Sequence, residues 1–141
     1  MLDKNQIFSF ERGAYFSGDL RYAIVVNEGR YVFKGEAFND FYWMDNCEFE
    51  IPEKEIEVLK KIVRPVEFWQ KKYEAEDEID DGFGWNIDFK YKDIFVGSGG
   101  YEKYPPNYGV VIWRLQRFVE RIGAKYNKNY QRKGKLKRMM L

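Results

Sequence analysis

Hydrophobic and polar residues alternate along much of the first fifty positions of the chain, a pattern that is typical of β-strands. The alternation extends from Gln6 to Ala37 and is interrupted at Asn27-Glu28-Gly29. This tripeptide predicts a hairpin turn in which Gly29 adopts a positive φ. A shorter alternation over residues 47–51 predicts another strand, so this part of the chain is expected to supply three or four strands.

Two later segments space their apolar residues three and four positions apart, which predicts amphipathic helices. The first begins after Pro52, a residue that suits the first turn of a helix, and is broken at Pro65. The second begins after Asn107, which is expected to cap it, and ends at Gly123. The apolar stripe of the first helix consists of Ile56, Leu59, Ile62 and Val63. That of the second consists of Val111, Leu115, Phe118, Val119 and Ile122.

The most regular alternation lies between these two helices. Its apolar residues are expected to face the core, and they are Trp85, Ile87, Phe89 and Tyr91. A reversal near Lys92-Asp93 leads into a strand over residues 94–96, and the glycine-rich residues 97–100 are expected to form an irregular connection. The resulting order is β-β-β-β-α-β-β-α. It predicts an α+β fold of two layers, in which an antiparallel sheet of five to six strands carries two main helices on one face.

The composition narrows the chemistry that the chain can perform. Its 141 residues include no histidine, which excludes Ser-His and Cys-His nucleophiles and the usual zinc sites. The acidic stretch 74–81 does not match a calcium-binding loop, because Ile79 occupies a ligand position. The glycines at 97–100 do not open directly into a helix, as a dinucleotide-binding loop requires. An enzyme that uses only carboxylates, lysine or tyrosine is a third alternative, but we expect a protein that is not an enzyme and has no cofactor or metal.

Charge divides the chain into two regions. Residues 1–123 contain 17 basic and all 23 acidic residues, whereas residues 124–141 contain seven basic residues and no acidic one. We expect 1–123 to form a single α+β domain, and 124–141 to be a basic tail that is partly disordered or extends the last helix. No apolar run approaches the roughly 18 residues of a membrane span. The single Cys47 and the lack of a signal-peptide pattern favour a cytoplasmic protein.

Two stretches carry a resemblance to known proteins. Residues 81–91 read Asp-Gly-Phe-Gly-Trp followed by the alternating strand, and residues 100–107 read Gly-Tyr-Glu-Lys-Tyr-Pro-Pro-Asn. Together they resemble a large group of small bacterial α+β proteins with the pattern Asp-Gly, Trp, strand, Gly and Tyr-Pro-x-Asn. The activity of that group is not established, so the resemblance implies a fold and no function. The doubled Pro105-Pro106 and the glycine at 109 depart from the commoner pattern.

The leading hypothesis for function is a non-catalytic protein-binding module. An acidic, histidine-free domain with 19% aromatic residues suits an inhibitor or immunity-type protein, anti-CRISPR-like or toxin-immunity-like, that acts on a basic partner surface such as that of a nuclease. This step rests on analogy with proteins of that class. The residues expected to contact the partner are Phe41, Tyr42, Trp43, Glu76, Asp77, Glu78, Asp80, Asp81, Tyr101 and Tyr104.

The alternative hypothesis is an accessory protein that binds nucleic acid. Three arginines recur at helical spacing on the last helix, and the basic tail interleaves its cations with Tyr126 and Tyr130. The residues expected to contact nucleic acid are Arg114, Arg117, Arg121, Lys125, Arg132, Lys133, Lys135, Lys137 and Arg138.

Overall fold

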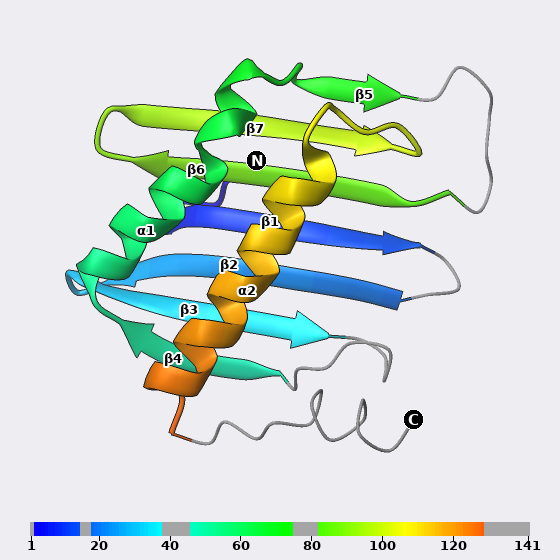
Figure 1. The fold of residues 1–141 in the computed structure, drawn as a ribbon. Coiled ribbons are helices and arrows are strands. Elements are labelled where there is room, and N and C mark those ends of the chain that lie inside the picture. The colour runs from blue at the N-terminus through cyan, green and yellow to red at the C-terminus, as the bar shows by residue number, and fades with distance from the viewer. Residues whose placement is uncertain (1, 15–17, 38–45, 75–81, 129–141) are drawn as a thin grey trace.

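One seven-stranded sheet carries both α-helices on the same face (Figure 1). The computed structural model describes residues 2–14, 18–37, 46–74 and 82–128, and every count below refers to them. The strands are β1 (Gln6–Ala14), β2 (Gly18–Asn27), β3 (Arg30–Ala37), β4 (Cys47–Ile51), β5 (Lys72–Glu74), β6 (Gly84–Tyr91) and β7 (Ile94–Tyr101). The helices are α1 (Glu53–Val63), the 3-10 helix η1 (Arg64–Phe68) and α2 (Tyr108–Tyr126).

The strand order across the sheet is β4-β3-β2-β1-β6-β7-β5. The predicted α+β class with helices on one face is confirmed, but the sheet has seven strands and not five or six. The additional strand is β5, which pairs with β7 in parallel, whereas all other neighbours are antiparallel. Because β5 is only three residues long, it shows no alternation that the sequence could reveal.

The turns of the two hairpins follow the predictions. Glu28 and Gly29 have φ values of 52° and 77°, as a two-residue hairpin loop with positive φ at both positions requires. Lys92 reverses the chain between β6 and β7 with a φ of 55°. Both hairpins and the start of α1 therefore lie at one end of the sheet, which we call the hairpin end (Figure 1).

The glycine-rich residues 97–100 are part of strand β7, so the expectation of an irregular connection there is wrong. Polar side chains of β6 lie across two of these glycines. A Cβ atom on Gly97 would lie 2.5 Å from Asp88 Oδ1, and one on Gly99 would lie 2.8 Å from Asn86 Oδ1. Glycine at these positions therefore reflects a close approach between neighbouring strands.

Helix α2 differs from its prediction at both ends. Asn107 precedes the helix, but its φ of 67° is left-handed and its side chain makes no capping hydrogen bond, because side-chain capping needs an extended backbone. Gly123 does not end the helix, which continues to Tyr126 and leaves Gly123 buried. A glycine ends a helix when it turns left-handed, and here the residues beyond it are held by a contact with α1.

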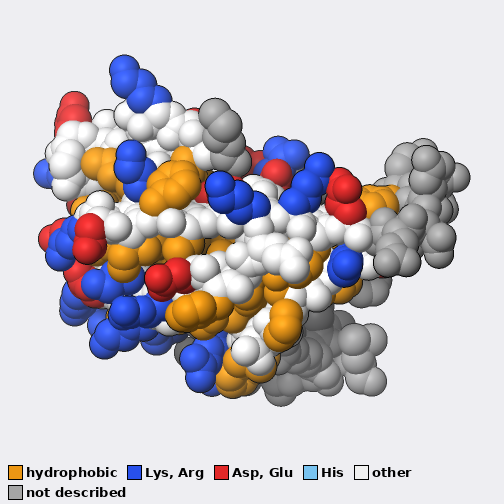
Figure 2. Space-filling view, turned by 90° about the horizontal axis from the view of Figure 1, so that it is seen from above, with side chains coloured by type: hydrophobic (Ala, Val, Ile, Leu, Met, Phe, Trp, Pro, Cys, Tyr) orange, Lys and Arg blue, Asp and Glu red, His pale blue; other side chains and the backbone are white. Residues whose placement is uncertain are grey.

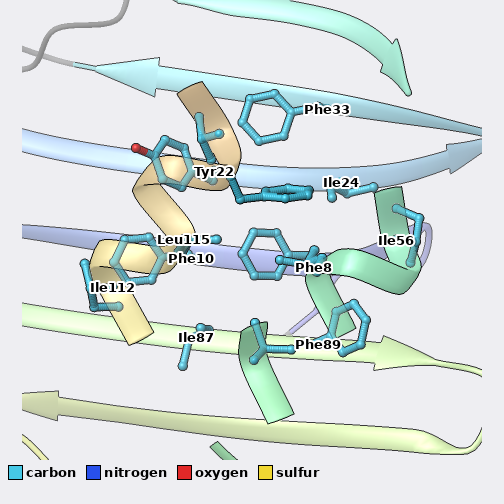
Figure 3. Close-up of a cluster of buried hydrophobic side chains, with 14 of the residues drawn as sticks. Phe8, Phe10, Tyr22, Ile24, Phe33, Ile56, Ile87, Phe89, Ile112 and Leu115 are labelled. Carbon is cyan, nitrogen blue, oxygen red and sulfur yellow. The ribbon is translucent and has the colours of Figure 1, made fainter. Parts of the chain in front are cut away.

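The core lies between the sheet and the two helices (Figure 3). Trp85, Ile87, Phe89 and Tyr91 are all buried, as predicted. Aromatic rings extend this layer across β1, β2, β3 and β4, with centroid distances of 5.8 Å for Phe10–Tyr22, 5.8 Å for Tyr22–Phe33 and 5.2 Å for Phe33–Phe49. The apolar stripes of α1 and α2 cover these rings, so the aromatic residues are in large part core residues.

Candidate functional site

Tyr101, at the end of β7, joins the two flanks of the acidic stretch. Glu74, the last described residue before the stretch, pairs with Tyr101 in the β5–β7 ladder. Gly82, the first described residue after it, donates its backbone N–H to the Tyr101 hydroxyl at 2.8 Å. The neighbouring Phe83 N–H donates to the Glu102 carboxylate, and Glu102 N–H donates to the Phe83 carbonyl at 2.9 Å. The fold therefore fixes both flanks of the stretch beside one predicted partner-binding tyrosine.

Tyr104 belongs to an aromatic cluster that is formed by Trp69, Tyr73, Trp85, Tyr104 and Tyr108. The Tyr104 ring stacks on Trp85 with a centroid distance of 6.4 Å and an angle of 18°, and its centroid is 4.8 Å from that of Tyr108. Trp85 is held in place because its Nε1 donates to the Lys103 carbonyl at 3.0 Å. Tyr104 is 41% exposed, whereas Trp85 is 4% exposed. The cluster thus presents one rigid aromatic edge to solvent.

The phenols of Tyr104 and Tyr108 stay neutral over a wide pH range. Burial raises the pKa of Tyr108 to about 12. Burial also raises the pKa of Tyr104, with a further contribution from the Glu102 charge. Both phenols are therefore protonated at neutral pH and present uncharged aromatic rings.

The remaining predicted partner-binding residues lie outside the described residues. These are Phe41, Tyr42, Trp43, Glu76, Asp77, Glu78, Asp80 and Asp81. The flanks of the 38–45 segment are described, and Ala37 N–H donates to Asn46 Oδ1 at 2.9 Å. Ala37 occupies the same row of the sheet as Gly100, four strands away. At about 4.8 Å per strand the two flanks are roughly 19 Å apart, at the end opposite the hairpins, which we call the loop end.

The predicted arginine row on α2 is divided by the fold. Arg121 Nη1 and Nη2 donate to the two carboxylate oxygens of Glu55 on α1, at 3.0 and 2.7 Å. Tyr126 also donates its hydroxyl to Glu55, at 2.7 Å. Hydrogen bonds from Arg121 hold the pKa of the buried Glu55 carboxyl below its usual range. Arg121 thus serves the helix contact while its side chain stays 45% exposed, and it differs from the rest of the row in having a carboxylate partner.

The other arginines of the row face solvent beside an aromatic residue that the sequence reasoning missed. Trp113 is 58% exposed, and the Arg117 guanidinium lies 5.3 Å from its ring centroid. Arg114 and Lys125 are exposed, whereas Arg132, Lys133, Lys135, Lys137 and Arg138 lie outside the described residues. The sequence held a signal for Trp113, because this residue falls outside the apolar stripe of the helix.

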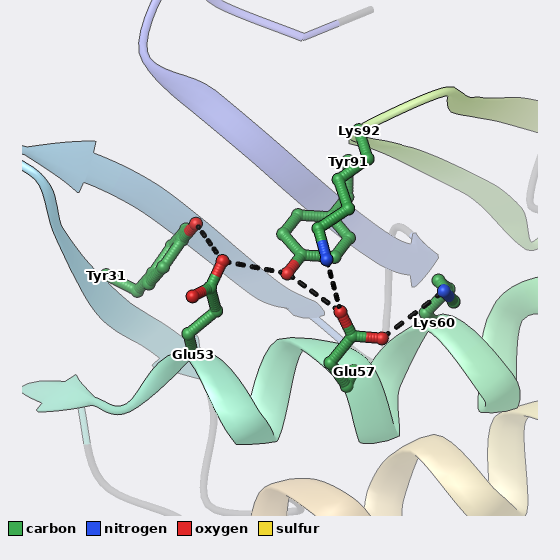
Figure 4. Close-up of polar contacts among 6 residues, drawn as sticks. All are labelled: Tyr31, Glu53, Glu57, Lys60, Tyr91 and Lys92. Carbon is green, nitrogen blue, oxygen red and sulfur yellow. Dashed lines mark hydrogen bonds and ion pairs between the residues drawn. The ribbon is translucent and has the colours of Figure 1, made fainter.

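A polar network at the hairpin end connects α1 to the sheet (Figure 4). The Tyr91 hydroxyl lies 2.9 Å from Glu53 Oε1 and 3.0 Å from Glu57 Oε1. Lys92 and Lys60 approach the Glu57 carboxylate at 2.9 and 3.2 Å. Hydrogen bonds, first of all from Lys92, lower the pKa of Glu57 to about 2, and burial raises that of Tyr91 to about 12. Because cations neutralise the carboxylate, the network is structural.

The sheet face that carries no helix is polar and balanced in charge. Arg21 lies 3.3 Å from Glu11, Lys34 3.7 Å from Glu48, and Arg30 3.7 Å from Glu50. Two shallow hollows on this face share Glu11 and Arg21. Glu48 and Glu50, which the sequence suggested as part of an acidic surface, therefore each have a basic neighbour on β3. Among the described residues no group of three or more Cys, Asp or Glu side chains is arranged to hold a metal ion.

Comparison with protein-family models and with curated proteins found no match to this chain. Within the described part of the chain, neither α-helix is long and apolar enough to cross a membrane. Function is therefore inferred from the surfaces of the molecule.

Proposed function

We propose that this chain is a non-catalytic protein-binding module that acts on a basic surface of another protein through the loop end of its sheet. The observation that carries the proposal is the position of Tyr101, which holds both flanks of a stretch with five acidic and no basic residues between Glu74 and Gly82. Tyr104 lies three residues further along the chain, as the exposed edge of a rigid aromatic cluster.

Acidic residues and exposed tyrosine have complementary roles in such an interface. The acidic stretch accelerates the encounter with a basic partner, and this effect weakens as salt screens it. A preorganised aromatic side chain supplies contact area at little entropic cost, and binding energy concentrates in such residues. An inhibitor or immunity-type protein, anti-CRISPR-like or toxin-immunity-like, that covers the basic surface of a nuclease is the member of this class that we propose.

The proposal is tested with the full chain as bait in an extract of the cell that makes it. Captured protein is joined to the bait with a carbodiimide, which links lysine directly to carboxylate, and the linked residues are mapped by mass spectrometry. We expect links from Glu76, Asp77 or Glu78 to partner lysines. Links that start from Glu48 or Glu50 instead, or the absence of any captured protein, would contradict the proposal.

Association kinetics with the captured partner then separate the two parts of the site. A Glu76→Gln, Asp77→Asn, Glu78→Gln variant should slow association at low salt, and Tyr104→Ala should accelerate dissociation. The matched control is Glu48→Gln with Glu50→Gln, which removes charge from β4, the strand at the far edge of the sheet. The control should bind like the unmodified chain.

A further inference from the structure

The positive charge of the helix layer is concentrated on α2. Residues 108–128 contain five basic residues and one acidic residue, Glu120, whereas residues 53–68 contain four of each. Arg121 is bound to Glu55. The other four have no ion-pair partner among the described residues, and they are Arg114, Arg117, Lys125 and Lys128. The solvent face of α2 is therefore cationic without internal compensation, unlike the helix-free face of the sheet.

Trp113 lies within this cationic face. It is 58% exposed, and Val110, one turn earlier, is 53% exposed. The Arg117 guanidinium lies over the Trp113 ring, 5.3 Å from its centroid. In the space-filling view the helix layer runs along the lower border, where exposed hydrophobic side chains stand beside basic ones (Figure 2). An exposed indole can stack with another aromatic ring, and a neighbouring cation adds to the attraction.

We propose that the solvent face of α2 binds single-stranded nucleic acid, with Trp113 stacking on a base and Arg114, Arg117, Lys125 and Lys128 contacting phosphates. This combination of an aromatic platform and a cationic track is the one by which proteins bind unpaired strands without sequence preference. From Arg114 to Lys125 the cations extend over about 17 Å of helix, and Lys128 follows just beyond the end of α2 at Tyr126. The helical length corresponds to about five phosphates at the spacing of one stacked strand.

The sequence after the helix is also basic and contains a tyrosine. Five further basic residues and no acidic one follow Lys128, and Tyr130 stands among them. The proposal nevertheless rests on the described residues of α2 and is independent of the loop end. An unpaired strand is favoured over a duplex because the bases of a duplex are already stacked on each other. It is favoured over an acidic polypeptide because a carboxylate gives Trp113 no ring to stack on.

The test is the fluorescence anisotropy of a labelled fifteen-nucleotide oligo(dT) titrated with the full chain at several salt concentrations. Trp113→Ala should weaken binding about tenfold, and Trp113→Phe should restore most of it, because the loss of one stacked base has an effect of this order. Arg117→Ala and Lys128→Ala should each reduce the slope of log K against log salt by about 0.7.

The opposite face of the molecule offers a matched pair of controls. Phe95 is 69% exposed and pairs across β6–β7 with the exposed Lys90. Phe95→Ala and Lys90→Ala remove an exposed aromatic residue and an exposed cation without touching α2, so both variants should bind oligo(dT) like the unmodified chain. Equal losses in these controls and in the α2 variants would overturn the proposal.

Four further results would overturn it. The first is the absence of oligo(dT) binding at low salt. The second is displacement of oligo(dT) by poly-glutamate as effectively as by unlabelled oligo(dT) at equal charge, which would indicate a surface for acidic polypeptides. The third is a Trp113→Ala chain that is folded by circular dichroism and binds with unchanged affinity. Tighter binding of a duplex of the same length would likewise exclude base stacking as the source of affinity.

Discussion

The two sides of α2 use the same residue type for different purposes. Toward α1, Arg121 forms two hydrogen bonds with the buried carboxylate of Glu55. Toward solvent, the guanidinium of Arg117, one helical turn earlier, lies over the Trp113 ring. The two arginines differ because only Arg121 has a carboxylate partner, Glu55 on α1. Nothing in the sequence of α2 itself reveals this difference. Regular spacing of basic residues on a helix therefore does not show which of them are available to a ligand.

The largest expected effect on stability is the difference between replacing Arg121 and replacing Arg117. Arg121→Ala leaves Glu55, which is 2% exposed, with a charge that only Tyr126 solvates. We expect this variant to lose about 3 kcal/mol of unfolding free energy, and Arg117→Ala to change it by less than about 0.5 kcal/mol. Urea denaturation of the two variants measures the difference. Similar losses in both would mean that the two sides of α2 are not energetically distinct.

The next effect concerns the end of α2. A chain that stops after Lys128 should be as stable as the full chain, because the whole helix and Tyr126 are retained. A chain that stops after Gly123 loses the last turn and the Tyr126 hydroxyl, which donates to Glu55 at 2.7 Å. We expect a loss of about 1–2 kcal/mol, visible as a drop of several degrees in the melting temperature.

Tyr126→Phe should account for part of this loss, since it removes only the hydroxyl. If both truncated chains melt together, the contact between Tyr126 and Glu55 contributes nothing to stability, and residues 124–126 belong to the tail in energetic terms.

A smaller effect is expected in the acid limb of the stability curve. Arg121 lowers the pKa of Glu55 in the folded protein, so the unfolded chain takes up a proton on this group first as pH falls. The stability that Glu55 contributes is complete above its unfolded pKa of about 4.3 and is lost as pH falls through the lower folded pKa. Glu55→Gln should therefore be less stable than the unmodified chain at pH 7, and the difference should shrink below about pH 4.

Urea denaturation between pH 7 and pH 3 measures this convergence. Glu120→Gln is the control, because Glu120 is exposed on α2 and has no ion-pair partner among the described residues. A constant gap between Glu55→Gln and the unmodified chain across this range would show that the charge of Glu55 is not what the contact with Arg121 requires.

The smallest effect is predicted for Trp113 itself. Because this side chain is 58% exposed, Trp113→Ala should change the unfolding free energy by less than about 0.5 kcal/mol. Phe118→Ala, on the buried side of the same helix, should lose about 3 kcal/mol or more. A loss above 1 kcal/mol for Trp113→Ala would indicate that the indole packs on the fold and is not held out for a ligand.

The sequence predicted those elements that depend on residues close together in the chain. The alternation of Trp85, Ile87, Phe89 and Tyr91 and the Glu28-Gly29 turn depend on neighbours in the chain, and the structure contains both. The role of the glycines at 97 and 99 depends on Asp88 and Asn86 in the adjacent strand. Strand β5 depends on its pairing with β7. These contacts join residues on different strands, so a pattern read over a short stretch of sequence does not reveal them.

For the candidate surfaces too, the sequence revealed local features and missed contacts between distant residues. Tyr101 and Tyr104 could be named from the sequence, because tyrosines between glycines and prolines are seldom core residues. That Tyr101 holds both flanks of the acidic stretch follows only from the sheet order. The ion pair of Arg121 could not be predicted because its partner, Glu55, lies 66 positions earlier. Trp113 could have been found by noting that it lies off the apolar stripe.

The central position of β1 has a consequence for how the chain reaches its folded state. Strands β1, β2 and β3 each pair with the next strand in the sequence, so this meander involves only short loop closures. The other edge of β1 pairs with β6, and Phe8 meets Phe89, 81 positions later. Contacts of such long range form slowly. Until they form, the nine residues of β1 present an edge of unpaired backbone N–H and C=O groups, which can pair with another chain. The chain is therefore most prone to aggregation just before β1 pairs with β6, the step that completes the sheet.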